Sequence, residues 1–237
     1  NLTIRIFIDL NVGMSRTGVL PENALPLFLY CKSLKGLNPV GLHAYDGHHR
    51  EADLAVRTKG CDEGFLRVSG LQHAIQSQTG ITCTIVTSGN TTISIHSKRK
   101  NIEVSPGTFI FWDYGYHKQF AEQPFAFAAV LITRIISKPD EETLCIDLGH
   151  KAVASENPLS QRVYFLNAPE LQAAGHSEEH LILKAPKGNT YKVGDVLYGV
   201  PFHICPTVAL HETLAVVENN RVTQNWNVVA RKRKITI

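Results

Sequence analysis

The fold of this chain is decided by residues 4–45, IRIFIDLNVGMSRTGVLPENALPLFLYCKSLKGLNPVGLHAY. The stretch begins with a short, β-branched apolar run from Ile4 to Leu10, which is typical of a buried parallel strand. Pro21 then predicts the start of a helix that runs to about Lys35, and Val40 to Tyr45 predict a second strand. A strand, loop, helix and strand at this spacing form a βαβ unit, which indicates a parallel sheet.

The pattern continues with a helix from about Asp62 to Gln78 and two further strands, Ile81 to Thr87 and Thr108 to Trp112. After about residue 120 it changes to short strand-like runs separated by turn residues. These runs are Phe125–Ile132, Leu144–Asp147, Val163–Leu166, Leu181–Leu183, Val208–Val217 and Trp226–Ala230. We therefore predict an α/β plus all-β protein, with part of a β/α barrel over residues 1–120 and an antiparallel β domain over residues 121–237.

Composition narrows the class of protein. The chain has 237 residues, of which 43% are hydrophobic, so it can bury a sizeable core. Its 24 basic and 21 acidic residues nearly balance, which argues against a nucleic-acid partner. No apolar run approaches the roughly 20 residues of a membrane span. The five cysteines are scattered without a CxxC pair, and residues 1–5 do not have the pattern of a signal peptide, so we expect a cytoplasmic protein.

The strongest local signal for chemistry is residues 201–207, PFHICPT. If this segment is a strand, His203 and Cys205 point to the same side and can reach one metal ion. Imidazole and thiolate together suit zinc, and two protein ligands leave positions open for water, a third residue or substrate. The alternative is a buried cysteine and a hydrogen-bonded histidine without a metal.

Polar clusters also follow three of the predicted strands. Residues 88–92, SGNTT, could hold a phosphate through backbone N–H groups, although an ordinary turn would have the same composition. Tyr45 could hydrogen-bond a ring nitrogen or simply pack in its loop, and Arg16 could bind a ligand or remain a solvated loop charge. Because the carboxyl ends of parallel strands meet at one edge, we expect the three clusters to converge.

Seven segments of the sequence, taken in order, resemble the motifs of one enzyme family, the D-threonine aldolases and D-serine dehydratases. They are residues 9–19, 44–48, 88–92, 106–109, 147–152, 177–180 and 203–211. The resemblance implies a fold-type III pyridoxal-phosphate enzyme, with a β/α barrel followed by a C-terminal β domain. We also expect a soluble protein, since no long apolar run is present, and a homodimer that acts on a small D-amino acid.

The resemblance assigns a role to each matching position. It implies that the cofactor phosphate is bound by Ser88, Gly89, Asn90 and Thr91, and that Tyr45 hydrogen-bonds the pyridine nitrogen. It places Arg16 beside the cofactor and makes His203 and Cys205 the metal ligands. The aldolases typically have an aspartate as the second metal ligand. The His-Ile-Cys string instead matches the zinc-dependent D-serine dehydratases.

The family's cofactor-binding lysine has no counterpart in this sequence. Lys32 and Lys35 fall on a predicted helix and Lys59 in a predicted polar loop. The first strand matches the middle of a family barrel, so we expect the sequence to be N-terminally incomplete by roughly a third of the family's length.

These implications predict a pyridoxal-phosphate- and zinc-dependent lyase that converts D-serine to pyruvate and ammonia. The first alternative is D-threonine aldolase, which needs a base that His211 or His48 could supply. A racemase ranks third, since racemisation needs no metal at the hydroxyl group. A non-catalytic zinc-binding remnant is the alternative from a different class.

Overall fold

The computed structural model of the chain describes residues 2–235. The chain divides into two compact units, Asn1–Phe109 and Ile110–Ile237. Residues 110–120, which the sequence analysis grouped with the barrel part, thus belong to the second unit.

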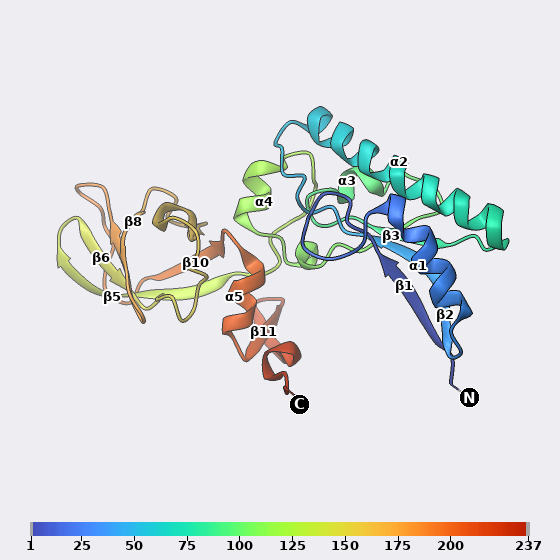
Figure 1. The fold of residues 1–237 in the computed structure, drawn as a ribbon. Coiled ribbons are helices and arrows are strands. Elements are labelled where there is room, and N and C mark those ends of the chain that lie inside the picture. Colours follow the sequence, from blue (N-terminus) through green and yellow to red (C-terminus); the bar gives the residue numbers. More distant parts are fainter. Residues whose placement is uncertain (1, 236–237) are drawn as a thin grey trace. The chain divides into compact units, whose positions relative to one another are not determined.

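The first unit is a four-stranded parallel sheet in the order β1-β2-β3-β4, with helices between its strands (Figure 1). Its elements are β1 (Ile4–Asp9), α1 (Pro21–Ser33), β2 (Leu37–Ala44), α2 (Leu54–Thr79), β3 (Thr84–Thr87), α3 (Ile93–His96) and β4 (Glu103–Val104). The helices α1 and α2 pack against one sheet face, where Phe28, Leu42 and Ile75 are fully buried in a shared core. The predicted βαβ pattern and parallel sheet are confirmed.

Local sequence explains where the two long helices begin and end. Pro21 opens α1 at its first position, where a missing N–H costs nothing. Helix α2 begins eight residues earlier than predicted, because the Asp53 carboxylate accepts hydrogen bonds from the backbone N–H groups of Ala55 and Val56. Gly80 ends α2 in a left-handed conformation, with φ of 74°.

The predicted fourth strand, Thr108 to Trp112, is wrong. The strand that pairs with β3 is Glu103–Val104, and Thr108–Ile110 is a single 3₁₀ turn. The apolar run from Thr108 to Trp112 therefore does not extend the sheet.

The second unit is built around a six-stranded antiparallel sheet in the order β7-β10-β5-β6-β9-β8. Its elements are α4 (Tyr114–Gln119), β5 (Leu131–Asp140), β6 (Thr143–Ile146), β7 (Val163–Phe165), β8 (Gln172–His176), β9 (Leu181–Lys184), β10 (Val196–Pro201), α5 (Ile204–Leu210), β11 (Thr213–Glu218) and β12 (Arg221–Asn227). Alternate residues of β6 and β9, such as Leu144 and Leu183, are fully buried in its core. The predicted antiparallel β domain is confirmed.

Three predicted strands of this unit differ in detail. The run from Phe125 becomes a strand only at Leu131, and the run from Trp226 belongs to the end of β12 followed by a 3₁₀ turn over Val229–Lys232. The third difference matters most, because residues 204–210 form helix α5 rather than part of a strand.

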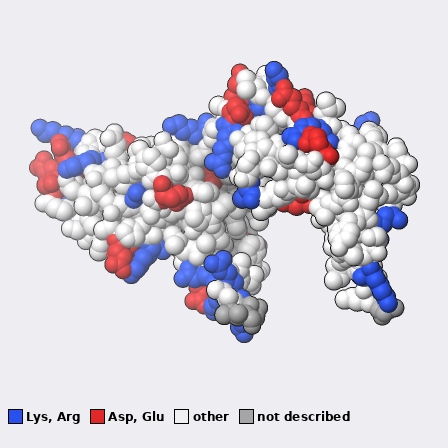
Figure 2. All heavy atoms as spheres, in the orientation of Figure 1, with Lys and Arg blue, Asp and Glu red and all other residues white. Residues whose placement is uncertain are grey.

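Charged side chains of both signs are interspersed on the face of the molecule shown in Figure 2. Within residues 2–235, no helix combines the length and apolar character needed to cross a membrane.

Candidate functional site

The carboxyl edge of the parallel sheet brings together the predicted cofactor residues. Strands β1, β2 and β3 are parallel neighbours, so the loops that carry Arg16, Tyr45 and Ser88 all leave the sheet at this edge. The Arg16 guanidinium carbon lies 4.9 Å from the centre of the Tyr45 ring, a cation–π distance. The expected convergence of these loops is therefore present in the first unit.

Two glycine residues hold the Tyr45 ring in place. A Cβ atom on Gly47 would lie 2.2 Å from the Tyr45 hydroxyl oxygen, and one on Gly89 would lie 2.8 Å from ring atom Cε2. Both distances are too short for any larger residue, so the ring packs directly on two stretches of backbone. The glycine in the SGNTT loop is thus required by the approach of Tyr45, and not by a left-handed backbone.

The SGNTT loop itself is a compact, buried polar turn. Ser88 has a positive φ of 84°, and its hydroxyl donates to the Gly89 carbonyl at 2.8 Å. The side chains of Asn90 and Thr91 are almost completely buried, and Asn90 Nδ2 donates to Thr108 Oγ1 at 2.6 Å. A tight turn lined by hydroxyl and amide groups at a strand end has the chemistry that a phosphate dianion requires. The residues present fit the phosphate of pyridoxal phosphate.

A carboxylate–imidazole pair beside Arg16 and Tyr45 was missed by sequence reasoning. Asp9 Oδ1 lies 2.7 Å from His43 Nδ1, and both residues line the same pocket as Arg16 and Tyr45. The two are direct partners in the β1–β2 register, so the pair becomes visible only when that register is known.

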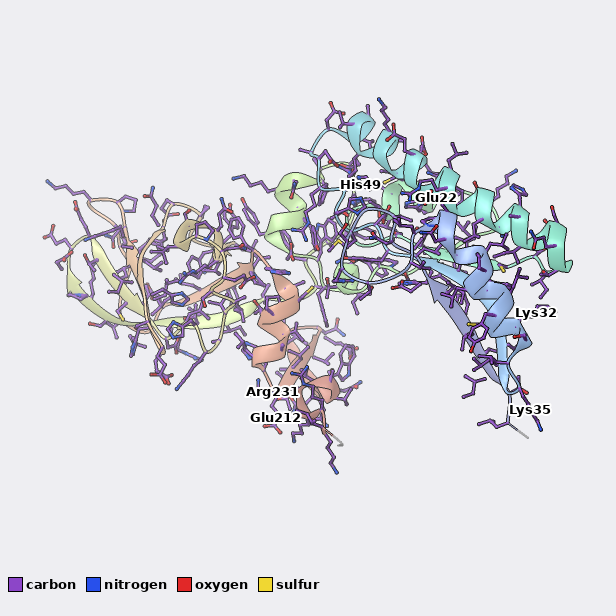
Figure 3. The ribbon with its side chains drawn as sticks, in the orientation of Figure 1. Glu22, Lys32, Lys35, His49, Glu212 and Arg231 are labelled. Carbon is purple, nitrogen blue, oxygen red and sulfur yellow. The ribbon has the colours of Figure 1, made fainter. Side chains whose placement is uncertain are left out.

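The lysines considered above lie away from this edge. Lys32 lies in the last turn of α1 and Lys35 just before β2, at the amino edge of the sheet, as Figure 3 shows. Lys59 lies on α2 and not in the predicted loop, with 80% of its side chain exposed. Within the described chain, no lysine lines the pocket formed by Asp9, Arg16, His43 and Tyr45.

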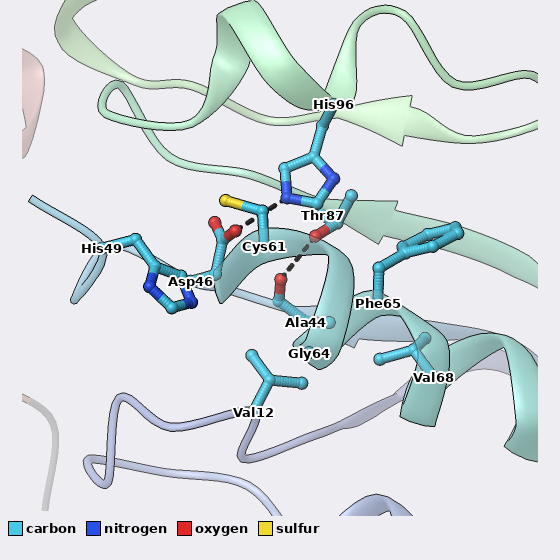
Figure 4. Close-up of a pocket in the computed structure, with 10 residues that line it drawn as sticks. All are labelled: Val12, Ala44, Asp46, His49, Cys61, Gly64, Phe65, Val68, Thr87 and His96. Carbon is cyan, nitrogen blue, oxygen red and sulfur yellow. Dashed lines mark hydrogen bonds and ion pairs between the residues drawn. The ribbon is translucent and has the colours of Figure 1, made fainter. Parts of the chain in front are cut away.

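A second buried cluster, Asp46, Cys61 and His96, lines another pocket of the first unit and was not predicted (Figure 4). Its three ligand-type atoms lie within 4.8 Å of one another. However, His96 Nε2 is 2.7 Å from Asp46 Oδ2, whereas two ligands of one tetrahedral zinc ion lie about 3.3 Å apart. Burial, and then the charge of Asp46, raises the pKa of the Cys61 thiol well above its ordinary value, which keeps it protonated. We therefore interpret the cluster as a hydrogen-bond network.

The predicted metal ligands of the second unit do lie together, although not for the predicted reason. His203 is the N-cap residue of α5 and Cys205 lies in its first turn, so the strand geometry assumed for this pair is wrong. The two side chains nevertheless hydrogen-bond each other, and Cys205 is exposed. The bond to Cys205, with a second bond to Glu156, outweighs burial and raises the pKa of His203 to about 9.

Buried hydrogen bonds fix the backbone of this turn. The buried carboxylate of Asp113 accepts from the backbone N–H of Ile204 at 3.0 Å and from that of Tyr116 at 2.8 Å. Thr207 Oγ1 donates to the His203 carbonyl at 2.8 Å. The contact between His203 and Cys205 is therefore held by the fold.

Glu156 is a further residue that the sequence did not indicate. Its Oε1 atom lies 2.5 Å from His203 Nδ1, which is a hydrogen-bond distance and too short for two ligands of one metal ion. Metal-binding histidines usually donate their second ring N–H to a carboxylate. The set of imidazole, thiol and supporting carboxylate fits zinc, with His203 Nε2 as the ligand nitrogen.

The two histidines considered as bases have different surroundings. His211 is the C-cap residue of α5, about 12 Å along the helix axis from His203, and its Nε2 donates to the Ala152 carbonyl at 2.8 Å. His48 has a buried Nδ1 atom without a hydrogen-bond partner among residues 2–235. Burial, and then the neighbouring His49, holds the pKa of His48 below its ordinary value. His48 is thus a neutral imidazole at pH 7, as a proton acceptor must be.

Two family models match the chain, one over each unit. Residues 1–115 match the alanine racemase N-terminal domain, and residues 128–217 match the model described as "Putative serine dehydratase domain". The chain belongs to the D-serine dehydratase and D-threonine aldolase family of fold-type III pyridoxal-phosphate enzymes.

Curated relatives agree with this assignment. The chain is 28% identical to a D-threonine aldolase of an Arthrobacter species over 239 residues, which cover 96% of this chain and 61% of the relative. It is 24% identical to a 3-hydroxy-D-aspartate aldolase of Paracoccus denitrificans, covering 95% of this chain and 60% of that protein. The chain thus spans about three fifths of these relatives.

Solved structures show the same fold. A D-threonine aldolase from Filomicrobium marinum superposes with a TM-score of 0.86 at 24% identity, covering 97% of this chain and 63% of that one. A D-threo-3-hydroxyaspartate dehydratase from Delftia sp. HT23 superposes with a TM-score of 0.79 at 18% identity, covering 95% of this chain and 65% of that one. The fold is therefore part of a β/α barrel followed by a β domain.

Proposed function

We propose that the chain carries the cofactor-phosphate site and the metal site of a lyase that acts on a D-β-hydroxy-α-amino acid. The observation that carries this proposal is the contact between His203 and Cys205 at the start of α5, together with the hydrogen bond between Glu156 and Nδ1 of His203. In a family of pyridoxal-phosphate enzymes, such a pair is suited to hold zinc. We further propose dehydration of D-serine to pyruvate and ammonia as the reaction.

The two groups that the protein would bind supply different chemistry. When bound, pyridoxal phosphate is an electron sink for the bonds at Cα, and zinc is a Lewis acid for the β-hydroxyl group. The SGNTT loop would hold the cofactor phosphate, and the Tyr45 hydroxyl would hydrogen-bond the pyridine nitrogen. Arg16, stacked on the Tyr45 ring, would keep positive charge beside the cofactor.

The metal residues would act through position and charge. His203 Nε2 and Cys205 Sγ would hold the ion, while Glu156 keeps the proton of His203 on Nδ1 and so leaves Nε2 as the ligand. Two protein ligands leave the remaining positions open for the substrate hydroxyl group and water.

The choice of dehydration over carbon–carbon cleavage rests on Cys205. A thiolate selects zinc, which can accept the departing hydroxide. The solved structures of a dehydratase neighbour support this choice. They include a metal-free form of a D-threo-3-hydroxyaspartate dehydratase in which a cysteine is replaced by alanine, and a form in which a histidine two positions earlier is replaced. The same His-x-Cys spacing occurs here at residues 203 and 205.

D-Threonine aldolase activity is the second candidate, and the 28% identical curated relative favours it. Retro-aldol cleavage needs a base that takes the proton of the β-hydroxyl group while the oxygen stays on the leaving carbon. His48, with its lowered pKa and buried Nδ1, meets the chemical requirement for a base, and His211 is the other candidate.

Product identity tests the two candidates. The zinc-loaded, full-length enzyme should form pyruvate from D-serine faster than it forms glycine and acetaldehyde from D-threonine. Glycine and acetaldehyde as the main products would overturn the dehydratase proposal in favour of the aldolase. If neither substrate reacts and no zinc is retained, the lyase proposal itself fails.

A further inference from the structure

A set of polar side chains is completely buried between the SGNTT loop and the helices beside it. Asp46 follows β2, Cys61 lies on α2, and Thr92 and His96 lie at the two ends of α3, each no more than 4% exposed. Buried polar groups are stable only when each has a hydrogen-bond partner, so the bonds within this set determine how the loop is held.

Thr92 connects the loop to Asp46. Its Oγ1 atom accepts a hydrogen bond from the backbone N–H of Gly89 at 3.1 Å, and its hydroxyl proton is donated to Asp46 Oδ1 at 2.6 Å. The ionised carboxylate can only accept, so the direction of the second bond is fixed. The Gly89 backbone is therefore tied to Asp46 through one hydroxyl group.

His96 and Cys61 also hydrogen-bond the Asp46 carboxylate. Arg99 Nε donates to His96 Nδ1 at 3.1 Å, so the remaining ring proton lies on Nε2 and is donated to Asp46 Oδ2 at 2.7 Å. The protonated Cys61 thiol also hydrogen-bonds this carboxylate. Burial opposes ionisation of Asp46, but the bonds from His96, Thr92 and Cys61 outweigh it and hold its pKa below its ordinary value.

We propose that Asp46 is a positioning residue that fixes the SGNTT loop for the cofactor phosphate without touching the phosphate itself. The inference rests on the proposed function, in that it takes this loop as the phosphate site. Asp46 is buried, its oxygens accept from three other side chains, and its negative charge would repel a phosphate. Its effect on the phosphate must therefore pass through Thr92 and the Gly89 backbone.

Two substitutions, one at each partner, remove the hydrogen bond between Thr92 and Asp46. In Asp46→Asn, the new amide cannot accept from both Thr92 and His96, because one of its two positions is a donor. In Thr92→Val, the shape is kept but the hydroxyl group is lost. Thr92→Ser keeps the hydroxyl group and serves as the conservative rescue. Asp62→Asn is the matched control, because it removes an exposed carboxylate that contacts only the outer end of the network, at Arg99.

The first measurement compares equilibrium binding of pyridoxal phosphate and of pyridoxal, which lacks the phosphate, to the full chain. Asp46→Asn and Thr92→Val should raise the Kd for pyridoxal phosphate about tenfold, which is about 1.4 kcal/mol, and leave that for pyridoxal unchanged. Thr92→Ser and Asp62→Asn should stay within about twofold of the wild type. If Thr92→Val weakens binding and Asp46→Asn does not, Thr92 acts on the phosphate directly and the proposal is overturned.

Amide hydrogen exchange over residues 88–92 separates this inference from the proposed function. Exchange should be faster in Asp46→Asn and Thr92→Val and unchanged in Thr92→Ser, even if the wild-type chain binds neither ligand. Unchanged exchange in Asp46→Asn would refute the positioning role, whereas a wild type that binds neither ligand would refute only the phosphate site. Added Co²⁺ tests the metal alternative, because a thiolate absorption band that Cys61→Ser removes and Cys205→Ser retains would make the cluster a metal site.

Discussion

In the proposed metal site, Cys205 is the residue that would decide which metal ion is preferred. A thiolate favours zinc, whereas a carboxylate at the same position favours harder divalent ions. We predict that Cys205→Ala binds zinc at least about tenfold more weakly, and that Cys205→Asp shifts the preference toward manganese. Metal analysis of the purified proteins after dialysis measures both effects. Cys145→Ser, in the same unit, should keep its zinc, and equal zinc in Cys205→Ala and wild type would contradict the assignment.

In the proposed metal site, Glu156 would not contact the ion itself but would support its ligand His203. Its bond to His203 Nδ1 fixes the ring and increases the basicity of the other nitrogen. We predict that Glu156→Gln, which keeps the size but loses the charge, weakens zinc binding by about 10- to 100-fold. A chelator competition assay measures this change. Glu179→Gln, an exposed glutamate paired with Lys151, should leave zinc affinity unchanged, and an equal loss in both variants would mean a general charge effect.

At the scale of elements, the sequence predicted the first three strands of the parallel sheet, because their signals are local. The apolar run of β1, Pro21 at the start of α1 and Gly80 at the end of α2 each act on their own neighbours. The contact between Asp9 and His43 could not be predicted, since it depends on the register of two strands.

Residues 201–207 show that two residues can be correctly predicted to lie together although the secondary structure assumed for them is wrong. The apolar sequence around residue 204 is short enough to be a strand or a helix, and periodicity cannot distinguish them. Asp113, 91 residues earlier, accepts from the Ile204 backbone and caps the start of α5. His203 and Cys205 meet because His203 lies outside the helix, where its ring can turn toward the first helical turn.

The hydrogen bonds that Asp46 accepts from Cys61, Thr92 and His96 should make the stability of the loop after β3 depend on pH. The folded pKa of Asp46 lies below its unfolded value, so its contribution to stability is complete above about pH 5 and is lost as the pH falls through the folded pKa. The charged and titratable groups around it are Arg57, Cys61, His48, His49, His96 and Arg99.

We therefore predict that the wild type is more stable than Asp46→Asn by a constant amount above about pH 5, and that this difference shrinks below about pH 4. Hydrogen exchange within residues 84–99 of both proteins, measured across this pH range, tests the prediction. If the stability difference between wild type and Asp46→Asn grew as the pH fell, the prediction would be contradicted, because a group whose pKa is raised in the folded state would produce that trend.

At the scale of the whole molecule, the first unit contains four parallel strands, which cannot close an eight-stranded barrel. Phe7 of the edge strand β1 is 42% exposed, on a sheet face that α1 and α2 do not cover. The phosphate loop and the residues around Tyr45 are nevertheless fully formed. The proposed cofactor site therefore includes the residues assigned to the phosphate and the ring, whereas no lysine among the described residues lines the pocket beside Tyr45.

This arrangement leads to a prediction about covalent chemistry. The chain should bind pyridoxal phosphate through Tyr45 and the SGNTT loop, yet form no stoichiometric covalent adduct with it. A cofactor-binding lysine must reach the pocket beside Tyr45, whereas Lys32 and Lys35 lie at the opposite edge of the sheet and Lys59 points into solvent. Treatment with pyridoxal phosphate and then borohydride, followed by peptide mass analysis, measures the adduct. Low, scattered labelling of exposed lysines is the expected result, and it should not fall when Ser88 is replaced by alanine. A single lysine labelled stoichiometrically, with labelling that Ser88→Ala reduces, would show that a lysine of this chain does reach the site.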